Sequence, residues 1–128
     1  MIIKSRAIVL HSFKFGEDKI IVDLFTEEQG RVSFVAPIST SPKAKIKKLY
    51  FQPFSILDIE YDYRQNKSLQ RFKYVGIAFM YDSLQYDSYK LAISLFLAEF
   101  TYYAIRDEQK NIPLFAYVMN SLQWLDGS

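Results

Sequence analysis

The sequence contains no cysteine, a single histidine and only four glycines among its 128 residues. Without cysteine there is no disulfide, no thiolate nucleophile and no zinc site built on sulfur ligands. One histidine, His11, leaves almost no basis for a Ser-His-Asp triad or a multi-histidine metal centre. The glycines are scattered, so no phosphate-binding glycine loop is present. We therefore predict a protein that is not an enzyme, with no catalytic residues, no metal site and no cofactor.

Long apolar runs are also missing, because no stretch approaches the roughly 18 residues that a membrane span needs. Lys4 and Arg6 interrupt the apolar residues at the N-terminus, which lacks the continuous apolar block of a signal peptide. Half of the residues are hydrophobic and 17% are aromatic, which excludes a disordered chain. We expect a soluble, cytoplasmic protein with no membrane contact.

The charge is unevenly distributed, although the net charge is only +2. Residues 1–80 carry 13 lysines and arginines against 8 acidic residues, whereas residues 81–128 carry 3 against 6. No acidic residue lies between Glu28 and Asp58. Such asymmetry indicates a polyanion-binding portion joined to a portion with another role.

The first 80 residues alternate apolar and polar side chains as β-strands do. Glu27 to Gly30 has the composition of a tight hairpin turn. Five strands with short turns between them are typical of a small closed barrel, and the OB-type Greek-key barrel fits best. The five segments are residues 2–14, 19–26, 31–37, 49–63 and 69–78.

Beyond residue 81 the apolar spacing becomes helical. Asp87 or Ser88 can cap a helix that runs to about Arg106 and is apolar nearly all round, so we expect it to be buried on several sides. Asn111 followed by Pro113 signals a second helix start. The predicted fold class is therefore a β-barrel plus α: a five-stranded OB-fold over residues 1–80 followed by two to three packed helices in residues 81–128.

The strongest functional signal is a lysine-rich segment between the third and fourth predicted strands. Lysine ammonium groups pair with phosphates as mobile charges, without reading bases. A merely solvated surface loop is the alternative, since lysine-rich loops are common. OB barrels bind single strands on one face and its framing loops, which favours nucleic acid. The four lysines are Lys43, Lys45, Lys47 and Lys48.

Two further sets of side chains have a functional and a structural interpretation. Aromatic residues near basic ones can stack on bases, although core packing is the favoured interpretation for each; they are Phe13, Phe15, Phe34, Tyr50, Phe72 and Tyr74. Asp58, Glu60 and Asp62 alternate along one strand and can recruit a divalent cation, as in a metal-dependent nuclease. A solvated polar face is the favoured interpretation of these carboxylates.

Several motifs, in order along nearly the whole chain, resemble the RecO family of bacterial DNA-repair proteins. The first half of the chain carries Arg6-Ala7-Ile8-Val9-Leu10, Phe15-Gly16-Glu17-Asp18-Lys19, Leu24 to Arg31 and Leu49 to Phe54. The second half carries Ala92 to Glu99, Asn111 to Phe115 and Asn120-Ser121-Leu122. The resemblance covers about the first half of a usual member. It implies that residues 1–80 are an OB-fold DNA-binding domain and residues 81–128 the first helices of a helical domain whose remainder is absent, so we expect a fragment.

The resemblance implies a recombination mediator that acts in the repair of DNA damage. Such proteins bind single- and double-stranded DNA, anneal complementary strands and help load RecA onto DNA coated with single-strand-binding protein, together with RecR and RecF. Contact with single-strand-binding protein is expected through the absent C-terminal part. By position, the DNA-binding residues are Arg31, Lys43, Lys45, Lys47 and Lys48, with Arg6, Arg71 and Lys73 in support.

One departure and one rival interpretation remain at this point. The family commonly continues from strand three into a glycine- and arginine-containing basic stretch, whereas this chain has residues 36–41, APISTS, before its lysines.

The rival is a protein-interaction scaffold, in which the barrel meets a partner such as RecR and this portion has little DNA affinity. A phosphate interface weakens in about 0.5 M salt, whereas an apolar protein interface does not.

Overall fold

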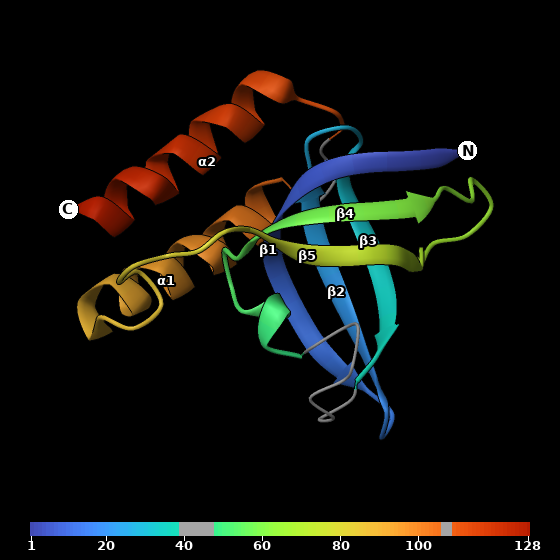
Figure 1. Ribbon diagram of the computed structural model, residues 1–128, viewed down its shortest axis with the longest axis horizontal. Coiled ribbons are helices and arrows are strands. Elements are labelled where there is room, and N and C mark those ends of the chain that lie inside the picture. Colours follow the sequence, from blue (N-terminus) through green and yellow to red (C-terminus); the bar gives the residue numbers. More distant parts are fainter. Residues whose placement is uncertain (39–47, 106–108) are drawn as a thin grey trace.

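The computed structural model describes residues 1–38, 48–105 and 109–128 (Figure 1). Five strands, with one short 3-10 helix among them, precede two α-helices. The elements are β1 (Ile2–Phe15), β2 (Lys19–Thr26), β3 (Gly30–Pro37), η1 (Lys48–Phe51), β4 (Ile56–Asp62), β5 (Phe72–Phe79), α1 (Ser88–Ala104) and α2 (Ile112–Gly127). Five strands followed by helices confirm the predicted combination of sheet and helix.

The strands form one antiparallel sheet in the order β3-β2-β1-β4-β5. β1 is long enough to pair with β4 through its first half and with β2 through its second half. An isolated parallel bridge also joins Phe34 of β3 to Gln70, where the Val35 amide donates to the Gln70 carbonyl at 2.9 Å. Closure of this sheet into a barrel stays a prediction.

The turn between β2 and β3 forms where the sequence predicts it. Gly30 has a φ of 70°, a left-handed conformation that glycine adopts without steric cost. The Thr26 hydroxyl donates to the Gly30 carbonyl at 2.7 Å and accepts from the Gln29 amide at 3.0 Å. This local network fixes the register of the β2–β3 hairpin.

The predicted strand over residues 49–63 is wrong in its first half. Lys48–Phe51 forms η1, and β4 begins only at Ile56. Pro53 has no amide hydrogen for a strand ladder, and Phe54 has a φ of 64°, which turns the chain. The Phe54 amide instead donates to the Val9 carbonyl at 2.8 Å. The apolar alternation continues across this turn, so the hydrophobic pattern alone did not reveal it.

The last strand also departs from the expectation, because it begins at Phe72 and contains an irregularity. Phe72 pairs with Tyr61, while Tyr74 pairs with Glu60, with a register shift between Glu60 and Tyr61. Lys73 is the extra residue, as in a β-bulge. Phe72 therefore packs against the core and Tyr74 is exposed. The prediction that both aromatics face the core is correct only for Phe72.

Two apolar clusters hold the molecule together. One lies within the curved sheet, where the Phe34 ring stacks on Phe72 at 4.3 Å and meets Tyr61 edge-on at 4.9 Å. Burial raises the pKa of Tyr61 to about 12. The other cluster lies between the sheet and the two helices, with Phe25 against Phe115 at 5.5 Å. Figure 1 shows both helices on one side of the sheet.

Helix α1 begins as predicted, with the Asp87 side chain accepting from the amides of Tyr89 and Lys90. Its buried residues are small, Ser94 and Ala98, which lets the helix lie close to its neighbours. The expectation that α1 is buried on several sides is wrong in the described structure, where large apolar residues such as Phe96 and Phe100 are exposed. Within the described ranges, no helix is both long and apolar enough to cross a membrane.

The end of α2 is joined to the segment that leads from β5 into α1. The buried Asp126 carboxylate accepts from the amides of Asp82, Ser83 and Leu84 at 2.7–2.9 Å. Lys90 donates to the Ser83 hydroxyl at 2.8 Å and to the Asp126 carbonyl at 3.0 Å. Burial by itself raises the pKa of Asp126, but the three amides and Lys90 outweigh it and hold the pKa below its ordinary value.

Candidate nucleic-acid interface

Four cationic side chains gather around one open groove at the turn between β4 and β5. The groove has a volume of about 790 Å³, and Asp62 is the one carboxylate among its described lining residues. Val35, Leu69 and Phe72 provide apolar lining. All four cations are exposed to solvent. We name this surface the basic groove, and its cations are Arg64, Lys67, Arg71 and Lys73.

Gln70 holds the turn that carries these cations. Its side chain is buried, and its Nε2 donates to the carbonyls of Arg64 and Lys67 at 2.9 and 3.0 Å. Its Oε1 accepts from the Arg64 amide at 2.8 Å. The Gln70 backbone meanwhile bonds to Ser33 and Val35 of β3. One side chain therefore orders the turn while the backbone of the same residue fastens it to the sheet.

The single carboxylate of the groove is already neutralised. The amino terminus of Met1 donates to Asp62 at 2.7 Å, and Arg64 lies 3.0 Å from the same carboxyl group. The hydrogen bond from the amino terminus, with Arg64 and Lys73 nearby, holds the pKa of Asp62 below its ordinary value. Asp62 therefore stays ionised, and the groove keeps a net positive charge that suits phosphate.

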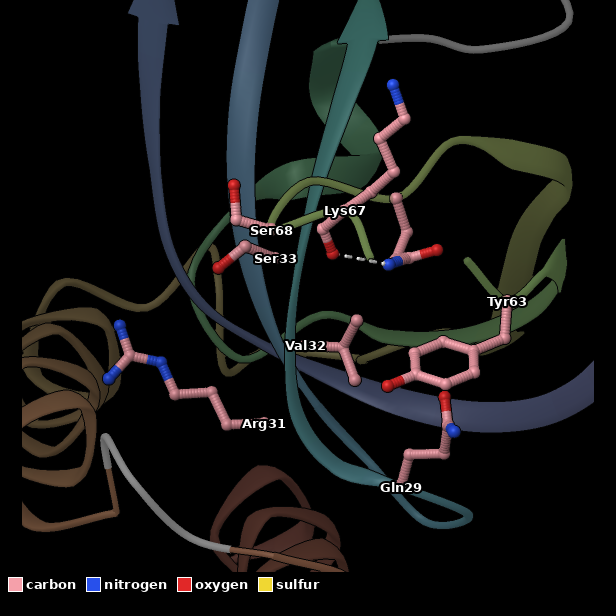
Figure 2. Close-up of a pocket in the computed structure, with 8 residues that line it drawn as sticks. Gln29, Arg31, Val32, Ser33, Tyr63, Lys67 and Ser68 are labelled. Atoms are coloured by element: carbon pink, nitrogen blue, oxygen red, sulfur yellow. Dashed lines mark hydrogen bonds between the residues drawn. The ribbon is translucent and has the colours of Figure 1, made fainter. Parts of the chain in front are cut away.

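A smaller polar pocket of about 390 Å³ adjoins the same turn (Figure 2). Lys67, Ser68 and Gln70 line both cavities. In Figure 2 the Tyr63 ring lies near Val32 and the end of Gln29, and the Lys67 side chain extends away from them. Lys67 therefore stands on the rim between the two cavities.

Arg31 lines the polar pocket, but its guanidinium points away from it, toward the helices (Figure 2). It lies 3.0 Å from the Asp23 carboxylate, and its side chain is only 13% exposed. The Tyr102 ring covers it, with the guanidinium carbon 4.3 Å from the ring centroid. The structure thus places Arg31 in a half-buried ion pair that joins β3, β2 and α1.

Arg6 lies with two of the three alternating carboxylates, Asp58 and Glu60, on another part of the sheet. Arg6 is 2.9 Å from Glu27, and Lys4 is 4.0 Å from Glu60. These four side chains and Asp58 line a hollow of about 340 Å³. The hollow contains charges of both signs, and Arg6 is not among the described residues that line the basic groove.

The predicted site residues therefore fall into separate groups. Arg71 and Lys73 come together in the basic groove, while Arg31 and Arg6 have acidic partners elsewhere. Lys43, Lys45 and Lys47 lie outside the described residues, and Lys48 opens η1 with a side chain outside the description. Their contact with DNA stays a prediction.

Sequence reasoning missed Arg64 and Lys67, which lie in the short connection between the strands predicted over residues 49–63 and 69–78. A signal was present, because both stand within the same strand-to-strand connection as Arg71 and close to Lys73. Summing the charge over the connection and its flanking strand would have marked it. Lysine and arginine in a loop that joins two strands of a predicted OB barrel favour a binding loop.

The aromatic candidates also divide. Phe34 is buried, and Tyr50 and Phe72 are half-buried against the core, as predicted. The favoured core interpretation is wrong for Phe13, Phe15 and Tyr74, whose side chains are exposed. Tyr74 extends along its own strand, where its hydroxyl occupies the space that a Cβ of Gly76 would need.

Comparison with known proteins matches the first part of the chain to a family model described as "Recombination protein O N terminal", over residues 1–81. "DNA repair protein RecO" of Bacteroides fragilis is 46% identical over 126 residues, 98% of this chain and 52% of that protein. The same-named proteins of Phocaeicola vulgatus and Flavobacterium johnsoniae are 43% and 42% identical, over 98% of this chain and 52% and 54% of those proteins.

The chain thus spans about half the length of the curated relatives it matches. The family match covers the whole sheet and the basic groove, and the relatives match across both helices as well. The matches therefore extend over both the sheet and the helices of this chain. The chain belongs to the RecO family of DNA repair and recombination proteins, of which it contains the N-terminal region.

Proposed function

We propose that this chain binds DNA without sequence preference, through the phosphates, as part of a RecO-type recombination mediator. The basic groove is the observation that carries the proposal: four exposed cations surround a cavity whose single described carboxylate is already paired. Lysine and arginine position a phosphate backbone and leave base edges unread. A protein that holds the backbone in this way leaves the bases of a strand free to pair with a second strand.

The proposed fold of residues 1–80 is an OB-type barrel. The bridge between Phe34 and Gln70, and the stack of Phe34 on Phe72, support a sheet that curls until β3 approaches β5. In OB barrels the loop between strands four and five frames the nucleic-acid face. The basic groove lies at that loop in this chain. Residues 81–128 are then the first helices of a second unit.

We further propose that the whole protein acts as the family resemblance implies. It would anneal complementary strands and help load RecA onto single strands coated with single-strand-binding protein, in partnership with RecR, within the cytoplasm. The family is one of non-enzymatic mediators. Contacts with single-strand-binding protein belong in this proposal to the part of the relatives that extends beyond this chain.

The test is a fluorescence anisotropy titration of a labelled single-stranded oligonucleotide at several salt concentrations. Four phosphate contacts on a single strand give a slope of log K against log salt of roughly −3. In the double variant Arg71→Gln/Lys73→Gln two contacts are lost, so the slope should flatten to roughly −1.4.

Lys4→Gln provides the matched control, because Lys4 is an exposed cation that lies beside Glu60 and not in the basic groove. It removes one positive charge and should leave the slope unchanged. If the double variant and the control titrate alike, the basic groove is not the DNA site.

The protein-interaction scaffold is the second candidate, and one observation favours it. Phe96, Phe100 and Tyr103 of α1 are exposed and line a mainly apolar hollow of about 400 Å³. Exposed apolar surface of this kind often marks a protein interface. Binding of a RecR-like partner through α1 should persist in about 0.5 M salt, in which binding to DNA should be lost.

A further inference from the structure

The hairpin of β1 and β2 carries two exposed phenylalanines. Phe13 and Phe15 are 45% and 52% exposed, although phenylalanine is usually buried. Ile20 and Val22, which face the sheet core, pair with Lys14 and Ser12. Since side chains alternate along a strand, Phe13 and Phe15 lie on the opposite, outer face.

Other aromatic rings continue the line toward α1. The His11 ring lies 5.7 Å from Phe13 and 4.8 Å from Tyr102, measured between centroids. Tyr102 in turn meets Tyr103, which is exposed, at 5.1 Å. A register shift between Val9 and His11 brings His11 onto the outer face. We name this line the aromatic row: Phe15, Phe13, His11, Tyr102 and Tyr103.

Cations lie at both ends of the aromatic row. Lys19 is the cross-strand partner of Phe15 and shares its face, whereas Lys14 pairs with Ile20 and lies on the opposite face. The Arg31 guanidinium lies against the other face of the row at Tyr102. Aromatic rings together with nearby cations are the chemistry that binds single-stranded nucleic acid, because bases stack and phosphates are neutralised. An apolar protein partner would desolvate Lys19 without supplying a counter-charge.

The aromatic row and the basic groove share one face of the sheet. Phe13 pairs across the ladder with Ile21, and Ile21 pairs with Val35 of β3. Directly paired residues point to the same side of a sheet. Val35 lines the basic groove. A strand that leaves the groove can therefore cross β3 and β2 and reach the phenylalanines without passing around an edge.

The spacing of the phenylalanines suits an unpaired base. Side chains two residues apart on a strand are separated by about 6.8 Å. Stacked bases are separated by about 3.4 Å, so a base between two rings needs about twice that distance. Bases within a duplex already stack on their neighbours and offer no free face.

From these placements we propose that the aromatic row stacks the unpaired bases of a single DNA strand whose phosphates lie in the basic groove. This inference rests on the proposed DNA binding and adds that the chain distinguishes single strands from duplexes. The groove holds the phosphates of either form. The row binds only the form whose bases are free.

The test compares Phe13→Ala/Phe15→Ala with the unchanged chain. The dissociation constants for a labelled 20-nucleotide oligothymidine and for a blunt duplex of equal length are measured at one salt concentration. We expect the single-strand constant to rise at least about tenfold, since stacking contributes roughly fivefold or more per base and two rings are removed. The duplex constant should stay within about twofold, and the salt slope for the single strand should not change.

Two further variants make the result specific to stacking. Phe13→Trp/Phe15→Trp keeps aromatic faces and should retain single-strand binding, whereas Phe13→Leu/Phe15→Leu keeps apolar bulk and should lose it. Tyr117→Ala removes an exposed aromatic from α2 and should leave both constants unchanged. Circular dichroism should show equal thermal unfolding for all variants, because the altered side chains are exposed.

The outcomes separate this inference from the proposed function. If the unchanged chain binds neither form, the proposed function fails and this inference fails with it. If it binds both and the alanine variant binds as well, DNA binding stands and the aromatic row has no part in it. Stacking is also overturned if the alanine variant loses affinity for single strand and duplex equally, or if the leucine variant binds the single strand as tightly as the unchanged chain. If the alanine variant loses self-association in sedimentation while its DNA binding is unchanged, the aromatic row is a protein contact.

Discussion

At the scale of single residues, Arg31 shows how a candidate binding cation can have a structural role. Asp23 is 7% exposed in its side chain and accepts hydrogen bonds from both Arg31 and Ser33. The β2–β3 register places Ser33 opposite Asp23, with Arg31 two positions away on the same strand face. Sequence alone gives the charge of Arg31 but not the neighbour that neutralises it.

We predict that Arg31→Met destabilises the fold by about 3 kcal/mol, because a buried carboxylate without its partner is strongly unfavourable. Urea denaturation monitored by circular dichroism measures this free energy of unfolding. Arg64→Met is the matched control, since Arg64 is 66% exposed in its ion pair with Asp62, and it should cost less than about 1 kcal/mol. Equal effects in the two variants would mean that the Arg31 pair carries no special stability.

The candidate site was accessible from sequence only in part, for reasons visible in particular residues. Arg71 and Lys73 were identified by their positions in the family resemblance, on one side of the strand predicted over residues 69–78. Lys67 was overlooked because its position on the rim depends on Gln70, whose buried side chain orders the turn. Phe13 and Phe15 were assigned to the core because apolar residues usually are. Their exposure follows from a register shift that alternation does not encode.

At the scale of elements, sequence reasoning succeeded where periodicity and end signals agreed. The helix starts at Asp87 and Asn111 and the turn at Gly30 were predicted from capping and turn chemistry, and each is present. The start of β4 was missed because Pro53 and Phe54 turn the chain without breaking the apolar alternation. Such a turn is decided by long-range contacts, among them the bond from the Phe54 amide to Val9.

The junction between α2 and the segment before α1 gives an element-scale prediction. Asp126→Asn should destabilise the fold by about 2 kcal/mol at neutral pH, because an amide cannot satisfy three backbone donors as a carboxylate does. The pKa of Asp126 is lowered in the folded state, so its contribution is complete above the unfolded pKa and declines as pH falls below about 4.

Thermal unfolding at pH 7 and at pH 3 measures both parts of this prediction. The unchanged chain should lose more stability between the two pH values than the Asp126→Asn variant does. An equal loss in both would show that Asp126 is not linked to acid destabilisation. Asp87→Asn serves as the control, since Asp87 caps α1 at an exposed position and asparagine is a comparable cap.

At the scale of the whole molecule, the positive charge concentrates in residues 1–80 and the negative charge in residues 81–128. The helices leave the basic groove uncovered, since its described lining comes from the sheet and the β4–β5 connection. A polyanion should therefore reach the groove at the β4–β5 connection without meeting the helices.

The lysines of residues 43–48 remain a separate candidate for phosphate contact, which their charge alone supports. If all four contact phosphate, changing Lys43, Lys45, Lys47 and Lys48 together to glutamine should flatten the salt slope by about 2.8 on a single strand. The anisotropy titration used for the basic groove measures it. An unchanged slope would remove these lysines from the DNA site and leave the basic groove as the remaining candidate.

The length of β1 has a consequence for how the chain folds. Its second half pairs with β2, and β2 pairs with β3, each through a short turn, so those pairings connect residues close in sequence. Its first half pairs with β4, as when Ile8 meets Ile56, 48 positions later in the chain. Closing such a long loop is entropically slower than closing a hairpin. The three N-terminal strands should therefore assemble early, and arrival of β4 should be the late, rate-limiting step in forming the apolar cluster within the sheet.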